Sequence, residues 1–148
     1  MITIQARPAG RTLAKADFEA LAHFRYQLRR FLRFSEEASQ AHGITPLQYQ
    51  LMLQIKGFPG RDWASVTELA ERLQSKHHGV VALISRCEAL GLVQRRASSS
   101  DLRLVEVRLT QSGERCLAAL AGLHRDELES LQDLLALAAI TPGAERRR

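Results

Sequence analysis

The sequence predicts a mainly α-helical protein with one small two-stranded β element, and three observations lead to this fold class. Apolar residues recur every three or four positions through long segments near both ends of the chain. Two shorter segments between them begin with helix-capping sequences. After a glycine that ends the last short helix, apolar residues alternate every second position, which is typical of a strand with one buried face.

The composition favours a folded domain with a basic surface. A chain of 148 residues suits one domain, and its 45% hydrophobic content with few glycines and prolines argues against disorder. Lys and Arg number 21 against 16 Asp and Glu, which gives a net charge of +5. This balance suits a polyanionic partner, although charge alone favours such a partner only modestly.

The sequence shows no signal for export, membrane insertion or a disulfide framework. The N-terminal stretch MITIQARPAGR lacks the apolar core of a signal peptide, and no run approaches the ~18 apolar residues of a membrane span. Cys87 and Cys116 form no Cys-x-x-Cys pair. We therefore expect a cytoplasmic protein without a membrane partner.

A first long helix is expected over residues 13–42, after an N-terminal arm formed by residues 1–12. Its apolar stripe consists of Leu21, Phe24, Leu28, Phe31 and Leu32. Arginines line another face, where a solvated surface is the simpler interpretation and contact with an anion is the alternative.

The second helix is expected to begin at Pro46, because Thr45 and Gln48 have the spacing of a capping box and proline suits the first helical position. It should end near Gly57. Residues 58–63 are expected to form a connecting turn, in which Trp63 packs against the protein rather than stacking on bases.

The third and fourth helices follow closely. Ser65 and Glu68 form a second capping box, and Ser75 is expected to cap the next helix. That helix should end at Gly91, where a left-handed residue is needed. Its inward stripe is expected to consist of Val80, Leu83, Ile84, Cys87 and Leu90. Its outward face is expected to carry Lys76, His77, Gly79, Ala82 and Arg86, with His78 near the edge.

A β-hairpin should follow, with one strand from Leu92 and a return strand whose buried face is Val105, Val107 and Leu109. The order helix, turn, helix, hairpin over about residues 46–110 is that of a winged helix-turn-helix, which places one helix in a DNA major groove. Between Lys76 and Arg108 lie six Lys or Arg residues and three acids, a local surplus of +3. A basic stripe on such an element is typical of a DNA-binding face.

A last helix is expected over residues 111–139, and whether Gly122 divides it into two is left open. Its heptad seam comprises Leu117, Ala121, His124, Leu128, Leu131, Leu135 and Ala138. A second set of apolar residues lies beside this seam and makes the apolar surface of the helix wider. We therefore expect the helix to pack against the first helix and against a second subunit. Residues 13–140 are thus expected to form one domain with dimerisation helices at both ends, followed by a disordered basic tail over residues 141–148.

The run LAERL…VALISRCEALGLVQRR…DLR…VRLTQSGE resembles the MarR (multiple-antibiotic-resistance regulator) family of bacterial transcription factors. The most specific parts are the strand entry at residues 90–93, the pair Asp101 and Arg103, and the junction at residues 109–113. The resemblance implies a homodimeric winged-helix regulator, commonly a repressor that a small molecule releases. Lys76-His77-His78-Gly79 departs from the small hydroxyl residues more common in the family, so base preference does not carry over.

The expected partner is therefore double-stranded DNA carrying an inverted repeat. Lys76, His77 and His78 should meet base edges, and Gly79 and Ala82 should allow close approach. Arg86, Arg95 and Arg96 are assigned to phosphates or to local pairing. The resemblance implies that Arg103 enters the minor groove with Asp101 bracing it. The complete predicted DNA face is Ser75, Lys76, His77, His78, Gly79, Ala82, Arg86, Arg95, Arg96, Asp101 and Arg103.

A small aromatic or anionic effector is expected only by analogy with the family. Its candidate lining residues are His23, Tyr26, Arg30, Tyr49 and Trp63, each equally suited to packing or to the surface. No metal or cofactor site is expected, because the histidines lack paired ligand spacing.

Three other functions compete with DNA binding. Thiol-based redox sensing is disfavoured because Cys87 lies on the inward stripe and no basic partner is assured for Cys116. An enzyme is not expected, because the sequence has no phosphate-binding glycine loop, nucleophile elbow or evident carboxylate pair. A winged helix used only for protein–protein contact is the remaining alternative.

Overall fold

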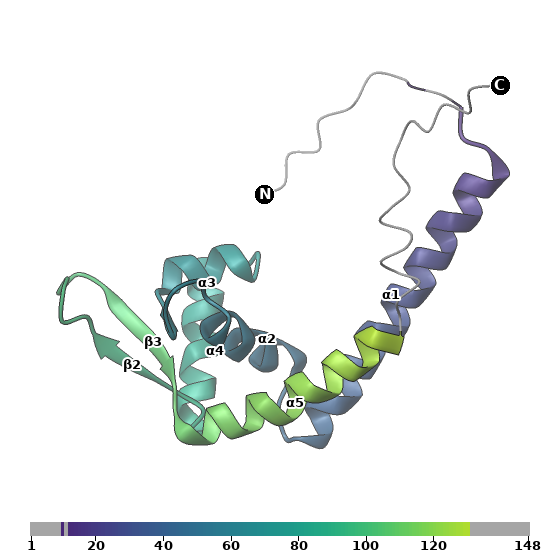
Figure 1. The fold of residues 1–148 in the computed structure, drawn as a ribbon. Helices are drawn as coiled ribbons and strands as arrows, with labels where there is room; N and C mark the ends of the chain where they lie inside the picture. Colours follow the sequence, from purple (N-terminus) through teal and green to yellow (C-terminus); the bar gives the residue numbers. More distant parts are fainter. Residues whose placement is uncertain (1–9, 11, 131–148) are drawn as a thin grey trace. The chain divides into compact units, whose positions relative to one another are not determined.

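The computed structural model describes residue 10 and residues 12–130 (Figure 1). The elements in chain order are α1 (Lys15–Ala41), α2 (Pro46–Lys56), β1 (Trp63–Ala64), α3 (Val66–Arg72), α4 (His77–Ala89), β2 (Val93–Ala97), β3 (Val105–Leu109) and α5 (Gln111–Ser130). The predicted fold class, mainly helical with a small β element, is confirmed. None of the helices in this part of the chain is long and apolar enough to span a bilayer.

The chain divides into two compact units. Residues 35–124 form the winged-helix unit, which contains the elements from α2 to β3 and the adjoining parts of α1 and α5. The other, called here the terminal-helix unit, contains the described residues before 35 and after 124. The predicted arm and tail fall largely on residues 1–9, 11 and 131–148, outside the described residues, so the predicted domain limits stay predictions.

Both predicted capping boxes are present. In α2, Thr45 Oγ1 accepts a hydrogen bond from the amide of Gln48 at 3.2 Å, and the Gln48 side chain accepts from the amide of Thr45 at 3.0 Å. In α3, Glu68 Oε2 accepts from the amide of Ser65 at 2.8 Å. Burial by itself would raise the pKa of Glu68, but the Ser65 amide and the guanidinium of Arg61 hold it below its usual value.

The predicted cap of α4 is wrong. This helix begins at His77 with Lys76 as its N-cap residue, and no side chain caps it. Gln74 adopts a left-handed conformation with φ of 49°, which lets the Ser75 amide donate to Ala70 O and close the end of α3. The Ser75 hydroxyl donates a hydrogen bond to Leu73 O at 3.2 Å, at the end of α3, and so does not cap α4.

The sheet has three antiparallel strands in the order β1-β3-β2, one more than the sequence predicted. Trp63 pairs with Arg108 and Ala64 with Val107. The additional strand is two residues long, too short for an alternating pattern to be visible in the sequence. Residues 58–62 do form the expected connection, but Trp63 belongs to the sheet.

The predicted buried face of β3 is only partly correct. Val107 is fully buried and Leu109 half-buried, but Val105 is 41% exposed. Val105 pairs with Ala97 at the far end of the hairpin, beyond the two residues that β1 covers. Glu106, which lies between two positions of the predicted buried face, is itself buried, and its carboxylate accepts hydrogen bonds from Arg108.

The core of the winged-helix unit lies between α2, α3, α4, the sheet and the start of α5. Its fully buried side chains include those of Leu51, Met52, Ile55, Leu69, Val80, Ile84, Cys87, Val93, Val107 and Leu120. Gly91, with φ of 72°, ends α4 as predicted. Leu90, expected to face inward, is 52% exposed because it is the C-cap residue and lies past the last inward turn.

Helix α5 starts against the base of the hairpin and is continuous through Gly122 to Ser130. Thr110 Oγ1 donates to Gly91 O at 2.6 Å and accepts from the amide of Gly113 at 3.0 Å. A Cβ atom at residue 113 would lie 2.0 Å from Leu92 O, so only glycine fits there. The seam residues Leu117 and His124 are buried, whereas Leu128 is 49% exposed, and the seam beyond Ser130 lies outside the described residues.

Candidate nucleic-acid interface

The outward face of α4 is exposed along its length. Val80, Leu83, Ile84 and Cys87 are buried and attach the helix to the core. The opposite face consists of Lys76, His77, His78, Gly79, Ala82 and Arg86, all exposed as predicted. Because no side chain caps α4, its first amides are available to an external acceptor, and they add a positive partial charge to that of Lys76.

Gly79 has no packing function in this chain. A Cβ atom at residue 79 would meet nothing within 4 Å. Glycine inside a helix costs about 0.5–1 kcal/mol relative to alanine. Its presence beside Ala82 on the exposed face leaves that face shallow and open to close approach.

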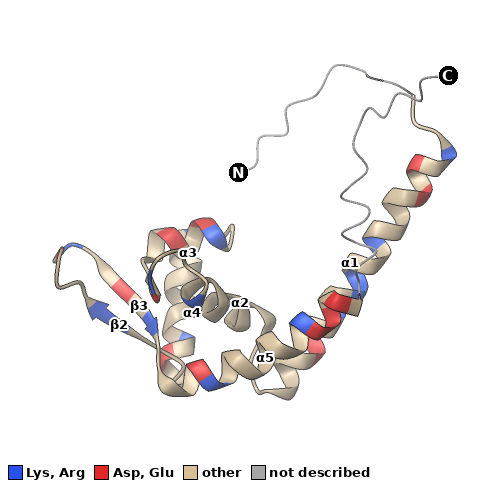
Figure 2. Cartoon of the chain, viewed as in Figure 1, with Lys and Arg blue, Asp and Glu red and all other residues tan. Residues whose placement is uncertain are grey.

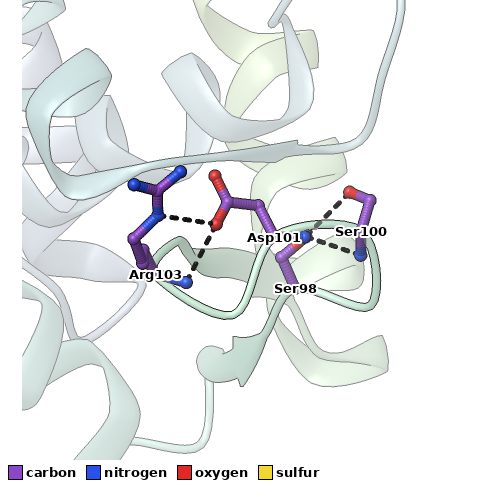
Figure 3. Close-up of polar contacts among 4 residues, drawn as sticks. All are labelled: Ser98, Ser100, Asp101 and Arg103. Atoms are coloured by element: carbon purple, nitrogen blue, oxygen red, sulfur yellow. Dashed lines mark hydrogen bonds and ion pairs between the residues drawn. The ribbon is translucent and has the colours of Figure 1, made fainter.

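The hairpin of β2 and β3 forms a wing that ends in an ordered turn. Ser98 is buried, and its Oγ accepts hydrogen bonds at 3.3 Å from the amides of both Ser100 and Asp101 (Figure 3). The amide of Ser98 donates to Leu104 O at 3.0 Å. The residues between these contacts are therefore held in a defined loop.

Arg103 is presented at the tip of this loop. Asp101 Oδ1 accepts from the backbone amide of Arg103 at 3.0 Å and from its Nε at 3.4 Å (Figure 3). The arginine side chain is nevertheless 93% exposed. The predicted contact between the two residues is thus present, and it leaves most of the guanidinium facing solvent.

The charges of this region separate into pairs and free cations. Each of its three acids contacts one arginine: Glu88 with Arg95, Asp101 with Arg103, and Glu106 with Arg108. Between residues 76 and 108 this leaves three exposed cations without an ion pair: Lys76, Arg86 and Arg96. Figure 2 shows the basic residues along the wing. The local surplus of +3 therefore resides at the N-cap of α4, on α4 itself and on β2, and all three cations are exposed.

Arg95 and Arg86 differ in how they are placed. Arg86 is exposed, and the local pairing predicted as one of its two roles does not form, because the nearby acids Glu88 and Asp101 contact other arginines. Arg95 is turned back onto α4, where it contacts Ser85 and Glu88. Of the two roles predicted for Arg95, the structure shows local pairing. The sequence did not indicate Ser85, because its contact joins residues ten positions apart.

The effector candidates lie in both units. In the winged-helix unit, Tyr49 is buried with its ring stacked on His124 at 4.3 Å between centroids, and burial raises its pKa. Trp63 is half-buried beneath the guanidinium of Arg61. In the terminal-helix unit, His23, Tyr26 and Arg30 are exposed, and Arg30 lies over the Tyr26 ring at 5.8 Å.

The cysteines are free thiols in apolar surroundings. Cys87 is fully buried, and burial raises its pKa to about 11. Cys116 is half-buried, and burial raises its pKa as well. Both thiols therefore stay protonated at neutral pH, which disfavours reaction with peroxide. Among the described residues, no group of three His, Cys, Asp or Glu could hold a metal ion.

Comparison with known sequences identifies the same region. Residues 42–104, from the start of the winged-helix segment to the wing loop, match the sequence model of the MarR family. The HTH-type transcriptional repressor MdtR of Bacillus subtilis is 28% identical over 78 residues, which is 53% of this chain and 48% of MdtR. The matched stretch thus spans about half the length of that relative.

Solved structures show the same fold over most of the chain. AbsC of Streptomyces coelicolor, a MarR family transcriptional regulator, gives a TM-score of 0.71 at 24% identity, over 90% of this chain and 95% of AbsC. A MarR family protein of Bacillus stearothermophilus gives 0.69 at 20% identity, over 88% and 86%. A mutant of S. aureus MepR, bound to an oligodeoxyribonucleotide, gives 0.63 at 18% identity, over 82% and 84%. The segment of residues 42–104 is thus similar in sequence to the MarR family, and the chain shares the winged-helix fold of solved MarR family structures.

Proposed function

We propose that this chain is a transcriptional regulator that binds duplex DNA through α4 and the wing. The observation that carries the proposal is the charge distribution, in which every acid of this region contacts an arginine while Lys76, Arg86 and Arg96 stay exposed and without an ion pair. When unpaired Lys and Arg side chains contact DNA phosphates, they displace the counterions bound to the DNA, and this release supplies much of the affinity. The relative MdtR, named as a repressor, supports the same function.

Helix α4 is the element proposed to enter the major groove. Its uncapped N-terminus carries Lys76, His77 and His78, with Ser75 just before it, so hydrogen-bonding groups cluster where winged helices meet base edges. Lysine donates to guanine acceptors, and imidazole donates or accepts according to its tautomer. Gly79 and Ala82 would bring the helix close to the groove floor.

The wing is proposed to add shape recognition. Arg103 projects from an ordered loop with its guanidinium almost fully exposed, which suits insertion into a narrow minor groove of negative potential. Asp101 limits the rotamers of that side chain, so less conformational freedom is lost on binding. Arg86 and Arg96 would contact phosphates on either side.

The functional form is proposed to be a homodimer that acts as a repressor. In the terminal-helix unit, Leu13, Phe18, Leu21, Phe24 and Leu32 are exposed large apolar side chains. So many on α1 and the residues just before it indicate an interaction surface, and a second copy of this chain is the partner proposed. A two-fold dimer would read an inverted repeat with half-sites about 34–36 Å apart.

The proposal also includes a small aromatic or anionic effector. In the terminal-helix unit the candidates are His23, Tyr26 and Arg30, which are accessible. In the winged-helix unit Trp63 is half-accessible, whereas Tyr49 could reach a ligand only if its packing against His124 changed. An effector would weaken DNA binding by preferring a dimer geometry that does not match the operator.

The test is fluorescence anisotropy of the purified protein with DNA from its own promoter region and with scrambled duplex, at two salt concentrations. We expect a preference for the promoter DNA, weakened by salt and by Arg103→Ala. Arg115→Ala is the matched control, because it removes an exposed arginine from α5 rather than from the wing. If the protein shows no preference for the promoter and Arg103→Ala has no effect, the proposal fails and a protein partner for the wing becomes the better hypothesis.

A further inference from the structure

Arg95 is the one cation of the DNA-binding region that is tied to another element. It lies on β2, and its guanidinium makes three contacts with α4. One Nη donates to Val81 O at 3.1 Å and to Ser85 Oγ at 2.7 Å, and the other donates to Glu88 Oε2 at 3.3 Å. The Ser85 hydroxyl in turn donates to Val81 O at 3.1 Å.

The three partners form a short track along α4. Val81, Ser85 and Glu88 follow one another at spacings of four and three, so they share one side of the helix. That side adjoins the exposed face that carries Ala82 and Arg86. A planar guanidinium can bind a carboxylate and two oxygen acceptors at once, which a lysine cannot reproduce.

We propose that Arg95 is a positioning residue that fixes the orientation of the wing relative to α4, with Glu88 and Ser85 as its partners. This inference rests on the proposed DNA-binding function. The guanidinium of Arg95 is held by three acceptors on α4, so we assign this arginine to positioning and not to a phosphate contact. The network of Arg95, Glu88 and Ser85 is called here the wing clasp.

A small change in the wing clasp would move the wing tip by a larger distance. Arg95 lies in the middle of β2, which ends at Ala97, so the loop begins three positions further on, about 10 Å away at about 3.3 Å per strand residue. A rotation of about 10° at the clasp would therefore move the tip by about 2 Å, which is enough to misplace an inserted arginine. The wing clasp thus sets whether α4 and Arg103 can engage the DNA together.

The first experiment needs no DNA. Amide hydrogen exchange is compared between the wild type, Arg95→Ala and the matched control Arg96→Ala, which removes the neighbouring exposed arginine that has no ion pair. Faster exchange in the wing of Arg95→Ala, with unchanged exchange in α2 and α4, is the expected result. Equal wing exchange in the two variants would overturn the proposal.

The second experiment measures the salt dependence of promoter binding for the same variants. A phosphate contact made by each subunit of the proposed dimer changes the slope of log K against log salt by about 0.9 per subunit, whereas loss of positioning lowers affinity without such a change. We expect Arg95→Ala to lower affinity but to leave the slope unchanged when it is compared in proteins that both carry Arg103→Ala, whereas Arg96→Ala should reduce the slope. A slope reduced by about 0.9 per subunit by Arg95→Ala in that comparison would show a direct phosphate contact and overturn the proposal.

Arg95→Lys separates charge from geometry. Lysine keeps the positive charge but lacks the planar guanidinium that binds several acceptors at once, so we expect this variant to bind promoter DNA nearly as weakly as Arg95→Ala. Wild-type affinity in this variant would contradict the wing clasp. Failure of the wild type to bind any duplex would refute the proposed function. The exchange measurement would then still decide separately whether Arg95 holds the wing.

Discussion

Replacing Gly113 by alanine should destabilise the winged-helix unit strongly. Residue 113 lies in the first turn of α5, where a Cβ atom would be 2.0 Å from the carbonyl oxygen of Leu92 and 3.0 Å from its carbon. The neighbour is backbone, so no side-chain rotation relieves the clash. The strand entry and the helix would have to move apart by more than about 1 Å to reach an ordinary contact.

The cost follows from what that movement breaks. Leu92 O also accepts the amide of Thr110 at 3.0 Å, and Thr110 Oγ1 joins Gly91 O to the amide of Gly113. Losing one or two of these hydrogen bonds costs about 1 kcal/mol each. Overpacking strain adds about 1–3 kcal/mol. We therefore expect the free energy of unfolding to fall by about 3 kcal/mol, which for this chain length lowers Tm by about 10 °C.

Gly122→Ala is the matched control in the same helix. A Cβ atom at residue 122 would meet nothing within 4 Å, so alanine should stabilise α5 by up to about 1 kcal/mol through its helix propensity. Urea unfolding followed by circular dichroism measures both variants. Effects of opposite sign are expected, and a Gly113→Ala protein as stable as the wild type would refute the reasoning.

Three further predictions concern α4 and the titrating groups. Gly79→Ala should raise the free energy of unfolding by about 0.5–1 kcal/mol, because the added methyl group meets no neighbour in the free protein. The same methyl group would face the DNA groove, so promoter binding measured by fluorescence anisotropy should be weaker. Unchanged binding would contradict close approach of α4 to the DNA. Burial raises the pKa of Cys87 to about 11. A disulfide reagent at about pH 8 should therefore modify Cys116 first and should modify Cys87 only as fast as the protein unfolds. Rapid modification of both thiols would contradict the burial of Cys87. The pKa of Glu68 is lowered on folding, so its contribution to stability is present above its unfolded pKa and is lost as pH falls through the folded pKa. Glu68→Gln should accordingly cost more stability at neutral pH than in acid, and equal loss by urea unfolding at both pH values would count against the ion pair with Arg61.

Features that depend on near neighbours were predictable from the sequence. Capping boxes join residues three apart, so Thr45 and Ser65 marked the starts of α2 and α3 without knowledge of the rest of the fold. A helix stripe likewise depends only on spacing, which is why the inward set from Val80 to Cys87 and the exposed face opposite it were predicted correctly. Gly91 marked the end of α4 because its left-handed conformation is a local requirement.

Features that join distant residues depend on the folded arrangement of the chain. β1 is a strand because β3 lies beside it, not because two residues have a strand pattern. Val105 is exposed and Glu106 buried because the hairpin extends past β1 and Arg108 satisfies the carboxylate. The difference between Arg95, held on α4, and Arg96, free on the same strand, depends on where β2 crosses that helix. Adjacent arginines look alike in a sequence, and only the surroundings that folding brings to each one separate a positioning residue from a candidate DNA contact.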